Sequence, residues 1–365
     1  MPHLFLAVTA HGYGHLAQCA PVVHALHRRI PGLRVTLQWD NDPGFARRRL
    51  PPGFDHIQEA ADVGLLMDGP LTTRWEESLD VYLDFDAGYE PRLERQTGIL
   101  RDLAPDLVLA DVPWLPLDAA RRLGIPAVGL CSLTWYDILL EGPLATRAPP
   151  ALVDRMRAVY AAADLFIRPV PSMPMGWLPN GVDVGPIARR AADSGPRRKL
   201  EIMDRLGIPV DRPLALMQFG GFSGFDPLRQ WPEQDRVHWL VQDLEGTRRR
   251  DASALTDLGL DLLQVLGVVD LILAKPGYGT FTEAACNGVP LLYVSRTDWP
   301  EELTLTSWIV QQVPALQVSL DELVSGSLAD PIANLLALGR ATPVDPSGIE
   351  AAADLIEPML AGRAQ

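Results

Sequence analysis

Short apolar runs alternate with longer amphipathic stretches along the chain, and no other feature of the sequence constrains the fold as strongly. A short continuous apolar run suits a strand that is buried on both faces, and an amphipathic stretch suits a helix that covers a sheet. The alternation therefore predicts an α/β protein with parallel sheets and helices on both faces. It occurs twice, so we expect two Rossmann-like, doubly wound domains.

The expected strands divide into two groups along the chain. The first group comprises residues 4–8, 35–39, 107–110, 127–131 and 165–167, the last of which would close its sheet. The second group comprises residues 214–219, 237–241, 271–274 and 291–294. A Pro- and Gly-rich stretch at 169–186, followed by a polar one at 191–199, is typical of an interdomain connection. We therefore expect domains at 1–190 and 191–345, and a C-terminal helical segment at 346–365 that packs on either of them.

Composition excludes several classes of protein. With 365 residues, of which 47% are hydrophobic, the chain is long enough to bury a core without disulfides. Cys19, Cys131 and Cys286 are far apart and lack the spacing of a zinc site, which favours a reducing cytoplasm and predicts no metal. The formal net charge of −14 argues against a nucleic-acid partner. The N-terminal apolar run is too short for a signal peptide or a membrane span, so no integral membrane segment is expected.

A glycine-rich turn follows the first expected strand, at residues 9–15. Gly12 and Gly14 allow a tight turn and close approach of the backbone to an anion or a polar substrate. The dinucleotide fingerprint would need its third glycine at Ala17, which its wider form tolerates, and the nearest acidic residue is Asp40, beyond the second strand. A nicotinamide cofactor is therefore an alternative with little support.

His15 ends this turn, at the carboxyl end of a strand, where ligands bind in such sheets. An imidazole there suits a general base that removes a hydroxyl proton near neutral pH; a surface or helix-capping histidine is the alternative. His11 is a candidate for a second substrate contact. Asp111 follows the strand at 107–110 and would orient His15, unless it only caps a helix.

A second glycine-rich turn opens the second unit. Gly220, Gly221 and Ser223 follow the strand at 214–219 and would supply donors to a diphosphate; an ordinary glycine-rich loop explains them as well.

The segment from 273 to 294 predicts a strand, a turn with Gly277 and Gly279, a helix, and a further strand. Thr280 and Glu283 have the spacing of a capping box, and Gly288 is placed to end the helix that they would start. A role in ligand binding is compatible with this structural role at the start of the helix. Thr280 and the helix N-terminus would receive a phosphate, Lys275 would add positive charge, and Glu283 would accept hydrogen bonds from ribose hydroxyls.

With these motifs, nearly the whole chain resembles the GT-B superfamily of glycosyltransferases, especially the MurG-like branch and the glycosyltransferase-like N-terminal part of L-arabinokinases. The strongest likeness runs from Lys275 through Glu283 and on to residues 287–302. In the related plant-type enzymes this segment reads His-Cys-Gly-Trp-Asn-Ser-Thr-Leu-Glu. The resemblance thus places Lys275 on the pyrophosphate-binding histidine, Thr280 on a phosphate-binding serine and Glu283 on the ribose-binding glutamate.

Other positions follow the same resemblance less closely. Asp298 matches the donor-sugar motif Asp-Gln of those enzymes but Trp299 does not, so that Glu301 or Glu302 would compensate. Residues 12–15 match their Gly-x-Gly-His, which gives His15 the role of general base, and Asp111 resembles the aspartate that supports it.

The resemblance implies two domains facing each other across a cleft and an inverting, metal-independent transfer. The donor would be a UDP or dTDP sugar, bound as a co-substrate with no other cofactor, and the acceptor a small molecule or a glycan. A noncatalytic sugar-nucleotide-binding module and a nucleotide-sugar epimerase or hydrolase are the alternatives.

Aromatic residues in the first unit are candidates for the acceptor side, and packing in the core is the alternative, which is favoured for the last three of those named below. They are Trp75, Tyr82 and Tyr89, within residues 62–90, and Trp114, Trp135 and Tyr136.

Overall fold

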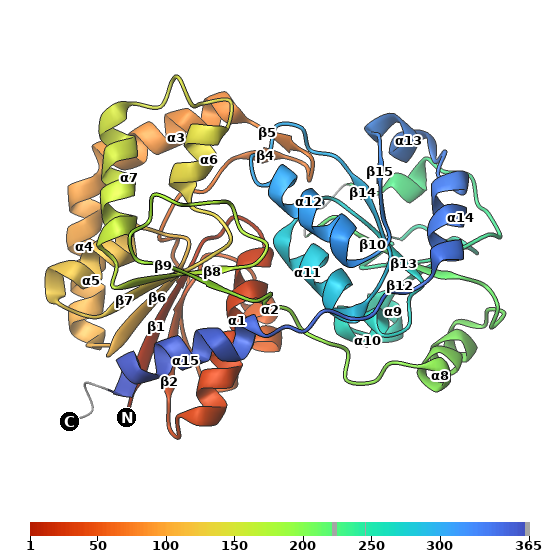
Figure 1. Cartoon of the computed structure of the whole chain (residues 1–365), viewed down its shortest axis with the longest axis horizontal. Coiled ribbons are helices and arrows are strands. Elements are labelled where there is room, and N and C mark those ends of the chain that lie inside the picture. The colour runs from red at the N-terminus through yellow and green to blue at the C-terminus, as the bar shows by residue number, and fades with distance from the viewer. Residues whose placement is uncertain (221–224, 245, 362–365) are drawn as a thin grey trace.

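The computed structural model describes residues 1–220, 225–244 and 246–361. Two parallel sheets, each covered by helices, lie side by side, as Figure 1 shows. The protein is therefore an α/β protein with two Rossmann-like units, as the alternation of apolar and amphipathic stretches predicted. Among the described residues, no helix is long and apolar enough to cross a bilayer.

The first sheet has seven parallel strands in the order β3-β2-β1-β6-β7-β8-β9. Its strands are β1 (His3–Val8), β2 (Arg34–Gln38), β3 (Asp55–Ile57), β6 (Leu107–Asp111), β7 (Ala127–Leu130), β8 (Leu165–Pro169) and β9 (Gly181–Val184). Its helices are α1 (Gly14–Arg29), α2 (Pro43–Arg49), α3 (Trp75–Ala87), α4 (Tyr89–Leu103), α5 (Leu115–Leu123), α6 (Trp135–Glu141) and α7 (Pro150–Ala162). A small antiparallel hairpin, β4 (Met67–Asp68) and β5 (Thr72–Thr73), precedes α3.

The second sheet has six parallel strands in the order β12-β11-β10-β13-β14-β15. Its strands are β10 (Leu214–Gln218), β11 (His238–Val241), β12 (Ala252–Ala254), β13 (Leu271–Ala274), β14 (Leu291–Val294) and β15 (Ala315–Val318). Around it lie α8 (Pro196–Leu206), the 3₁₀ turn η1 (Pro227–Arg229), α9 (Leu255–Leu258), α10 (Leu262–Leu266), α11 (Tyr278–Asn287), α12 (Glu302–Gln312), α13 (Leu320–Ser325) and α14 (Ala329–Leu338).

Each sheet has one point at which the strand order reverses, between β1 and β6 in the first sheet and between β10 and β13 in the second. Ligands of open α/β sheets bind at such points, outside the carboxyl ends of the strands. The glycine-rich turn before α1 and the segment that follows β13 therefore both lie where this rule places a ligand.

All nine predicted strands are present, but four strands at the edges of the sheets were not predicted: β3, β9, β12 and β15. As a result, residues 165–167 do not close the first sheet, because β9 pairs with β8 beyond them. β9 lies inside the stretch predicted to be a connection. All four strands are short, three of them (β3, β9 and β15) are partly exposed, and none has the long apolar run that marks a buried strand.

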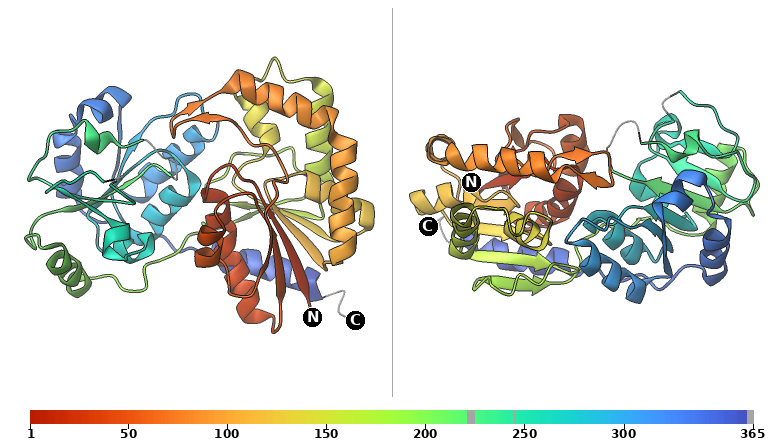
Figure 2. Two further views of the ribbon diagram at one scale, coloured as in Figure 1. Left: turned by 180° about the vertical axis from the view of Figure 1, so that it is seen from behind. Right: turned by 90° about the horizontal axis from the view of Figure 1, so that it is seen from above.

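The C-terminal helix α15 (Gly348–Ala361) packs on the first sheet's helix α1, although the chain has by then passed through the second sheet. Figure 1 shows it alongside α1, and in the left view of Figure 2 it lies near the start of the chain. Ala352, Ala353, Ile356 and Leu360 are fully buried in the cluster that contains α1 and β1. The sequence had left open which sheet this helix covers.

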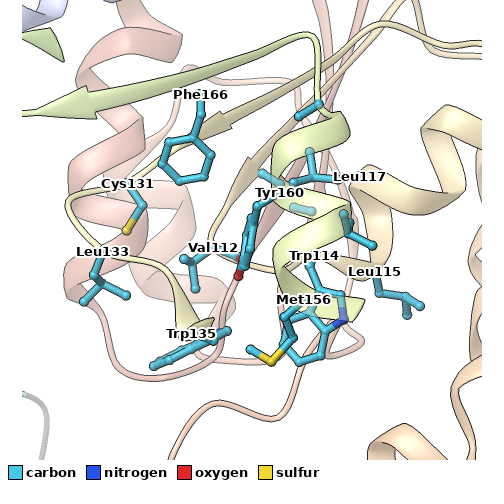
Figure 3. Packing of buried hydrophobic residues seen from close by; sticks show 14 of the residues in the cluster. Val112, Trp114, Leu115, Leu117, Cys131, Leu133, Trp135, Met156, Tyr160 and Phe166 are labelled. Atoms are coloured by element: carbon cyan, nitrogen blue, oxygen red, sulfur yellow. The ribbon is translucent and has the colours of Figure 1, made fainter. Parts of the chain in front are cut away.

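Several of the aromatic candidates for the acceptor side are core residues. Trp114 and Tyr82 are fully buried and stack on each other with ring centroids 6.0 Å apart. Tyr89 is buried too, and Figure 3 shows Trp114 near Tyr160 and Met156 inside the same cluster. For these residues, packing rather than stacking on a ligand is the role that the structure shows.

Candidate functional site

His15 and Asp111 lie in direct contact. β1 and β6 are adjacent parallel strands in which Val8 pairs with Asp111, so both strands end at the same edge of the sheet. Since α1 begins at Gly14, His15 lies in its first turn. Its Nδ1 is 2.9 Å from Oδ1 of Asp111. The contact that strand-end placement predicted is therefore present.

The surroundings of this pair are strongly acidic. Asp111 is fully buried and its Oδ2 accepts a hydrogen bond from the Cys19 thiol at 3.0 Å, while the His15 side chain is 13% exposed. Burial acts to lower the pKa of His15, but the charge and hydrogen bond of Asp111 outweigh it, and Glu301 and Asp62 add to them. The pKa of His15 is consequently raised.

His11 lies against the second sheet's side of the molecule. Its ring stacks on Trp299 with centroids 5.7 Å apart and an interplanar angle of 3°. Its Nδ1 is 3.0 Å from the carbonyl oxygen of Leu65. Burial, together with the charges of His15 and Lys275, lowers the pKa of His11 to about 3, so this ring is neutral at physiological pH.

The two glycines of the turn before α1 differ in whether their backbone conformation requires glycine. Gly12 has a φ of +86°, which other residues rarely adopt. At Gly14 an added Cβ would meet no atom within 4 Å, so the space there is open.

Asp62 is a buried acid beside His15 that the motifs did not single out. Its carboxylate accepts hydrogen bonds from Thr9 Oγ1 at 2.8 Å and from Trp135 Nε1 at 2.7 Å. Burial raises its pKa to about 6. Trp135 in turn packs edge-on against His11 at 5.4 Å. Asp62 follows no strand, and the sequence signal closest to it is that it begins the stretch 62–90, whose aromatic residues were candidates for the acceptor side.

Lys275 and the start of α11 follow β13 in the second sheet. Burial and the nearby charge of Arg296 lower the pKa of Lys275 to about 7, although Glu301 opposes them. The predicted capping box is wrong: α11 begins at Tyr278 with Gly277 as N-cap, and no side chain caps it. Thr280 consequently lies within the first turn, which is where an anion at this helix end would be. Gly279 offers open space there.

Glu283 lies further along α11 and is 8% exposed. Burial raises its pKa to about 7, and Arg189 Nε, 3.9 Å from its carboxylate, opposes this. Gly288 ends the helix with a φ of +68°, as predicted. Gly220 follows β10 with a φ of +83°, and the predicted contacts Gly221 and Ser223 lie outside the described residues.

The loop after β14 crosses to the first sheet's side. Asp298 accepts a hydrogen bond from Trp75 Nε1 at 2.9 Å, and Glu301 accepts one from Ser132 Oγ at 2.7 Å. Glu302, by contrast, is the first residue of α12 and accepts hydrogen bonds from Ser295 and from the backbone of Arg296, both in the loop that precedes this helix.

The structure thus brings candidate donor residues against candidate acceptor residues. Glu301 and Lys275 from the second unit act electrostatically on His15 and His11 of the first. Asp298 contacts Trp75, and Glu283 faces Arg189 instead of the histidines. The sequence did not predict these pairs, because their members lie in different units and local pattern does not record how two units pack.

Two curated proteins resemble the chain in sequence, and no protein-family model matches it. L-arabinokinase of Arabidopsis thaliana is 25% identical over 99% of this chain, which spans only 35% of that protein. An uncharacterized glycosyltransferase of Methanopyrus kandleri is 24% identical over 76% of this chain and 81% of its own length.

Solved structures resemble the chain over nearly its whole length. The calicheamicin glycosyltransferase has a TM-score of 0.63 at 18% identity and covers 100% of this chain and 99% of its own. UGT2 of Phytolacca americana, solved with UDP-2-fluoro-glucose and pterostilbene, scores 0.59 at 16% identity, covering 99% and 94%. MurG of Acinetobacter baumannii scores 0.56 at 15% identity, covering 98% and 99%.

A UDP-N-acetylglucosamine 2-epimerase also resembles it, with a TM-score of 0.52 at 14% identity, covering 100% of this chain and 98% of its own. The chain therefore has the GT-B fold, and its relatives in sequence and in structure include glycosyltransferases.

Proposed function

We propose that the protein transfers a sugar from a nucleoside-diphosphate sugar, of the UDP or dTDP type, to the hydroxyl of a small-molecule or glycan acceptor. One observation carries this proposal: His15 Nδ1 lies 2.9 Å from buried Asp111 at the strand-order reversal of the first sheet, within reach of the charge of Glu301 from the second unit. The charge of Lys275, also from the second unit, acts on the neighbouring His11. A transferase needs a base and an anion-binding group on opposite sides of one reacting centre.

His15 is the general base of the proposed reaction. Asp111 holds the Nδ1–H tautomer, which leaves the lone pair on Nε2 to take the acceptor's hydroxyl proton. The acceptor oxygen then forms a bond to the anomeric carbon as the bond from that carbon to the diphosphate breaks. The charge of Asp111 stabilises the imidazolium that results. Attack from the face opposite the diphosphate inverts the anomeric centre.

The second unit would receive the departing nucleoside diphosphate. α11 directs its N-terminal N–H groups to the region of Lys275 and Thr280, and a helix N-terminus favours an anion. Glu283 would accept hydrogen bonds from the ribose hydroxyls. These groups would neutralise the diphosphate without a divalent ion.

Calorimetric titration of the chelator-treated protein with UDP, dTDP, GDP and ADP tests the donor site. We expect one diphosphate to bind selectively, with an affinity at least about tenfold weaker in Glu283→Ala because a charge-assisted hydrogen bond is lost. Glu201→Ala, an exposed glutamate on α8, is the matched control and should bind normally. Absence of binding by all four diphosphates, or equal binding by Glu283→Ala, would contradict the proposed donor site.

An epimerase or hydrolase is the second candidate, favoured by two buried acids, Asp62 and Glu301, whose charges both act on His15. Incubation with the donor sugar alone separates the candidates. Release of free sugar or formation of an isomer without an acceptor would identify the second function. Dependence of turnover on an acceptor identifies the transferase, whereas binding without any turnover indicates a noncatalytic module.

A further inference from the structure

Cys131, which the proposed reaction does not use, lies next to the His15–Asp111 pair. Cys131 follows β7 directly, and its Sγ is 3.8 Å from His15 Nδ1. One donor atom from each of His15, Asp111 and Cys131 lies within 4.8 Å of the other two. Three elements that are distant in the sequence thus place a nitrogen, an oxygen and a sulfur donor around one point.

The geometry points to a site for a thiophilic divalent cation, Zn²⁺ or Cd²⁺, held by His15 Nδ1, a carboxylate oxygen of Asp111 and the Cys131 thiolate. In a tetrahedral zinc site, metal–ligand distances near 2.0–2.3 Å separate neighbouring donor atoms by roughly 3.3–3.8 Å. The 3.8 Å between Cys131 and His15 already fits this range, and the 2.9 Å between His15 and Asp111 needs to widen by about half an ångström.

Cys19 supports the same site from α1, four residues beyond His15 and on the same helix face. Its thiol donates to Oδ2 of Asp111 at 3.0 Å, so that Oδ1 is the oxygen directed to His15. The partners of metal ligands commonly fix the ligands in this way. The fourth coordination position would be open to a water molecule on the exposed side of His15.

Ligand chemistry sets which cations bind. A thiolate and an imidazole prefer Zn²⁺ and Cd²⁺, whereas Mg²⁺ and Ca²⁺ prefer oxygen ligands. Coordination releases the Cys131 thiol proton to solvent, and the imidazole proton moves from Nδ1 to Nε2. Nε2 then carries a hydrogen and has no lone pair for an acceptor hydroxyl. If the proposed function holds, the cation therefore switches the transfer off.

Titration of the full-length, chelator-treated protein with Cd²⁺ and with Zn²⁺ tests the site without any assay of transfer. We expect one equivalent of each to bind, and Cd²⁺ to give the ultraviolet charge-transfer band of a thiolate ligand. Cys131→Ala should lose the band and bind Zn²⁺ at least about tenfold more weakly, since even loss of a ligand's partner costs that much. Cys286→Ala removes the buried cysteine of α11, away from the cluster, and is the matched control.

Cys131→Ser provides a second test if the alanine variant does not fold, because serine keeps the size of the side chain but gives no thiolate band. Equal Zn²⁺ binding by the Cys131 variants and wild type, absence of the band in wild type, or equally tight binding of Mg²⁺ would overturn the site. Where transfer is observed, Zn²⁺ should inhibit wild type and Cys286→Ala reversibly, and Cys131→Ala much less.

Nucleotide binding separates this proposal from the proposed function. The cation should leave the calorimetric affinity for the diphosphate unchanged, because Lys275 and α11 are not among its ligands. If the protein binds the cation but no diphosphate, the cation site is supported and the proposed transferase function is contradicted.

Discussion

His15 has one ring nitrogen committed to Asp111, so its role depends on the other. Substitution His15→Gln keeps a polar side chain but removes the base, and we expect kcat to fall by about 10²–10⁴-fold, the range typical of general-base catalysis. The affinity for the diphosphate should not change, since His15 belongs to the first unit and the proposed donor site to the second. Steady-state kinetics and calorimetry measure the two quantities.

His24→Gln is the control for this substitution, because His24 lies on the same helix and bonds to the carbonyl oxygen of Arg49. It should leave kcat within about twofold. A loss of less than tenfold in His15→Gln would contradict the role of His15 as base.

Lys275 and Glu283 should give diphosphate binding a maximum near pH 7. Burial brings the pKa of each to about 7, but in opposite directions. As pH rises through 7, Glu283 becomes a carboxylate and accepts hydrogen bonds from the ribose hydroxyls more strongly, so the affinity for the nucleoside diphosphate rises. Over the same range Lys275 loses its charge, so affinity for the diphosphate falls.

Calorimetry over about two pH units on either side of this maximum checks both effects. In Glu283→Gln, the fall in affinity on the acidic side of the maximum should disappear. In Lys275→Met, the fall on the alkaline side should disappear. The nucleotide's own titration is common to all three proteins, so differences between them isolate the side chains. An unchanged profile in either variant would contradict the assignment for that residue.

At the scale of single elements, the end of α11 depends on a glycine. Gly288 and Gly207 both end helices with a φ of +68°. An alanine Cβ at 288 would lie 2.2 Å from the carbonyl oxygen of Ala341, whereas at 207 it meets nothing within 4 Å. Gly207→Ala should therefore cost about 1 kcal/mol, from backbone strain alone.

Gly288→Ala should cost about 1–3 kcal/mol more than Gly207→Ala, because the chain around Ala341 must move. Urea unfolding of the two variants provides the comparison. If both variants are destabilised equally, the chain around Ala341 moves aside with no loss of stability, and the prediction is wrong.

α15 should stabilise the first sheet although it follows the second in the chain. Ile356 is fully buried against α1 and β1, so Ile356→Ala should cost about 2–5 kcal/mol. Hydrogen exchange should show the lost protection in β1 and β2, not in β13 and β14. Leu338→Ala, at a position 67% exposed on α14, should change stability by no more than about 0.5 kcal/mol.

In the whole molecule, contacts between the two units hold the site together. Ser132 Oγ donates to the buried carboxylate of Glu301, and loss of a partner leaves a buried acceptor unsatisfied at about 1–3 kcal/mol. Ser132→Ala should therefore shift the ligand-free protein toward separated units, with a larger radius of gyration in small-angle scattering. Ser325→Ala, on α13, should not. An identical radius of gyration in wild type, Ser132→Ala and Ser325→Ala would contradict this role for Ser132.

Local pattern determined much of the fold. Buried strands are written as continuous apolar runs, so every internal strand was predictable, and two strand ends at one sheet edge were enough to pair His15 with Asp111. Gly288 was predictable as a helix end because many helices end in a residue of left-handed conformation, which glycine adopts most easily and which depends only on the local backbone. The capping box failed because its spacing recurs within a helix that starts earlier, at Tyr278.

Tertiary structure alone decided the rest. The edge strands exist because neighbours supply their hydrogen bonds, and α15 covers α1 because its apolar face fits there. Three contacts join residues that are many positions apart: Asp62 beside His15, Trp299 against His11, and Cys131 beside the pair of His15 and Asp111. The sequence by itself determined two parallel α/β units and the positions of their glycine-rich turns, since both depend on neighbours along the chain. Which side chains meet between the units depends on how two finished surfaces pack, and no periodicity in a sequence records that.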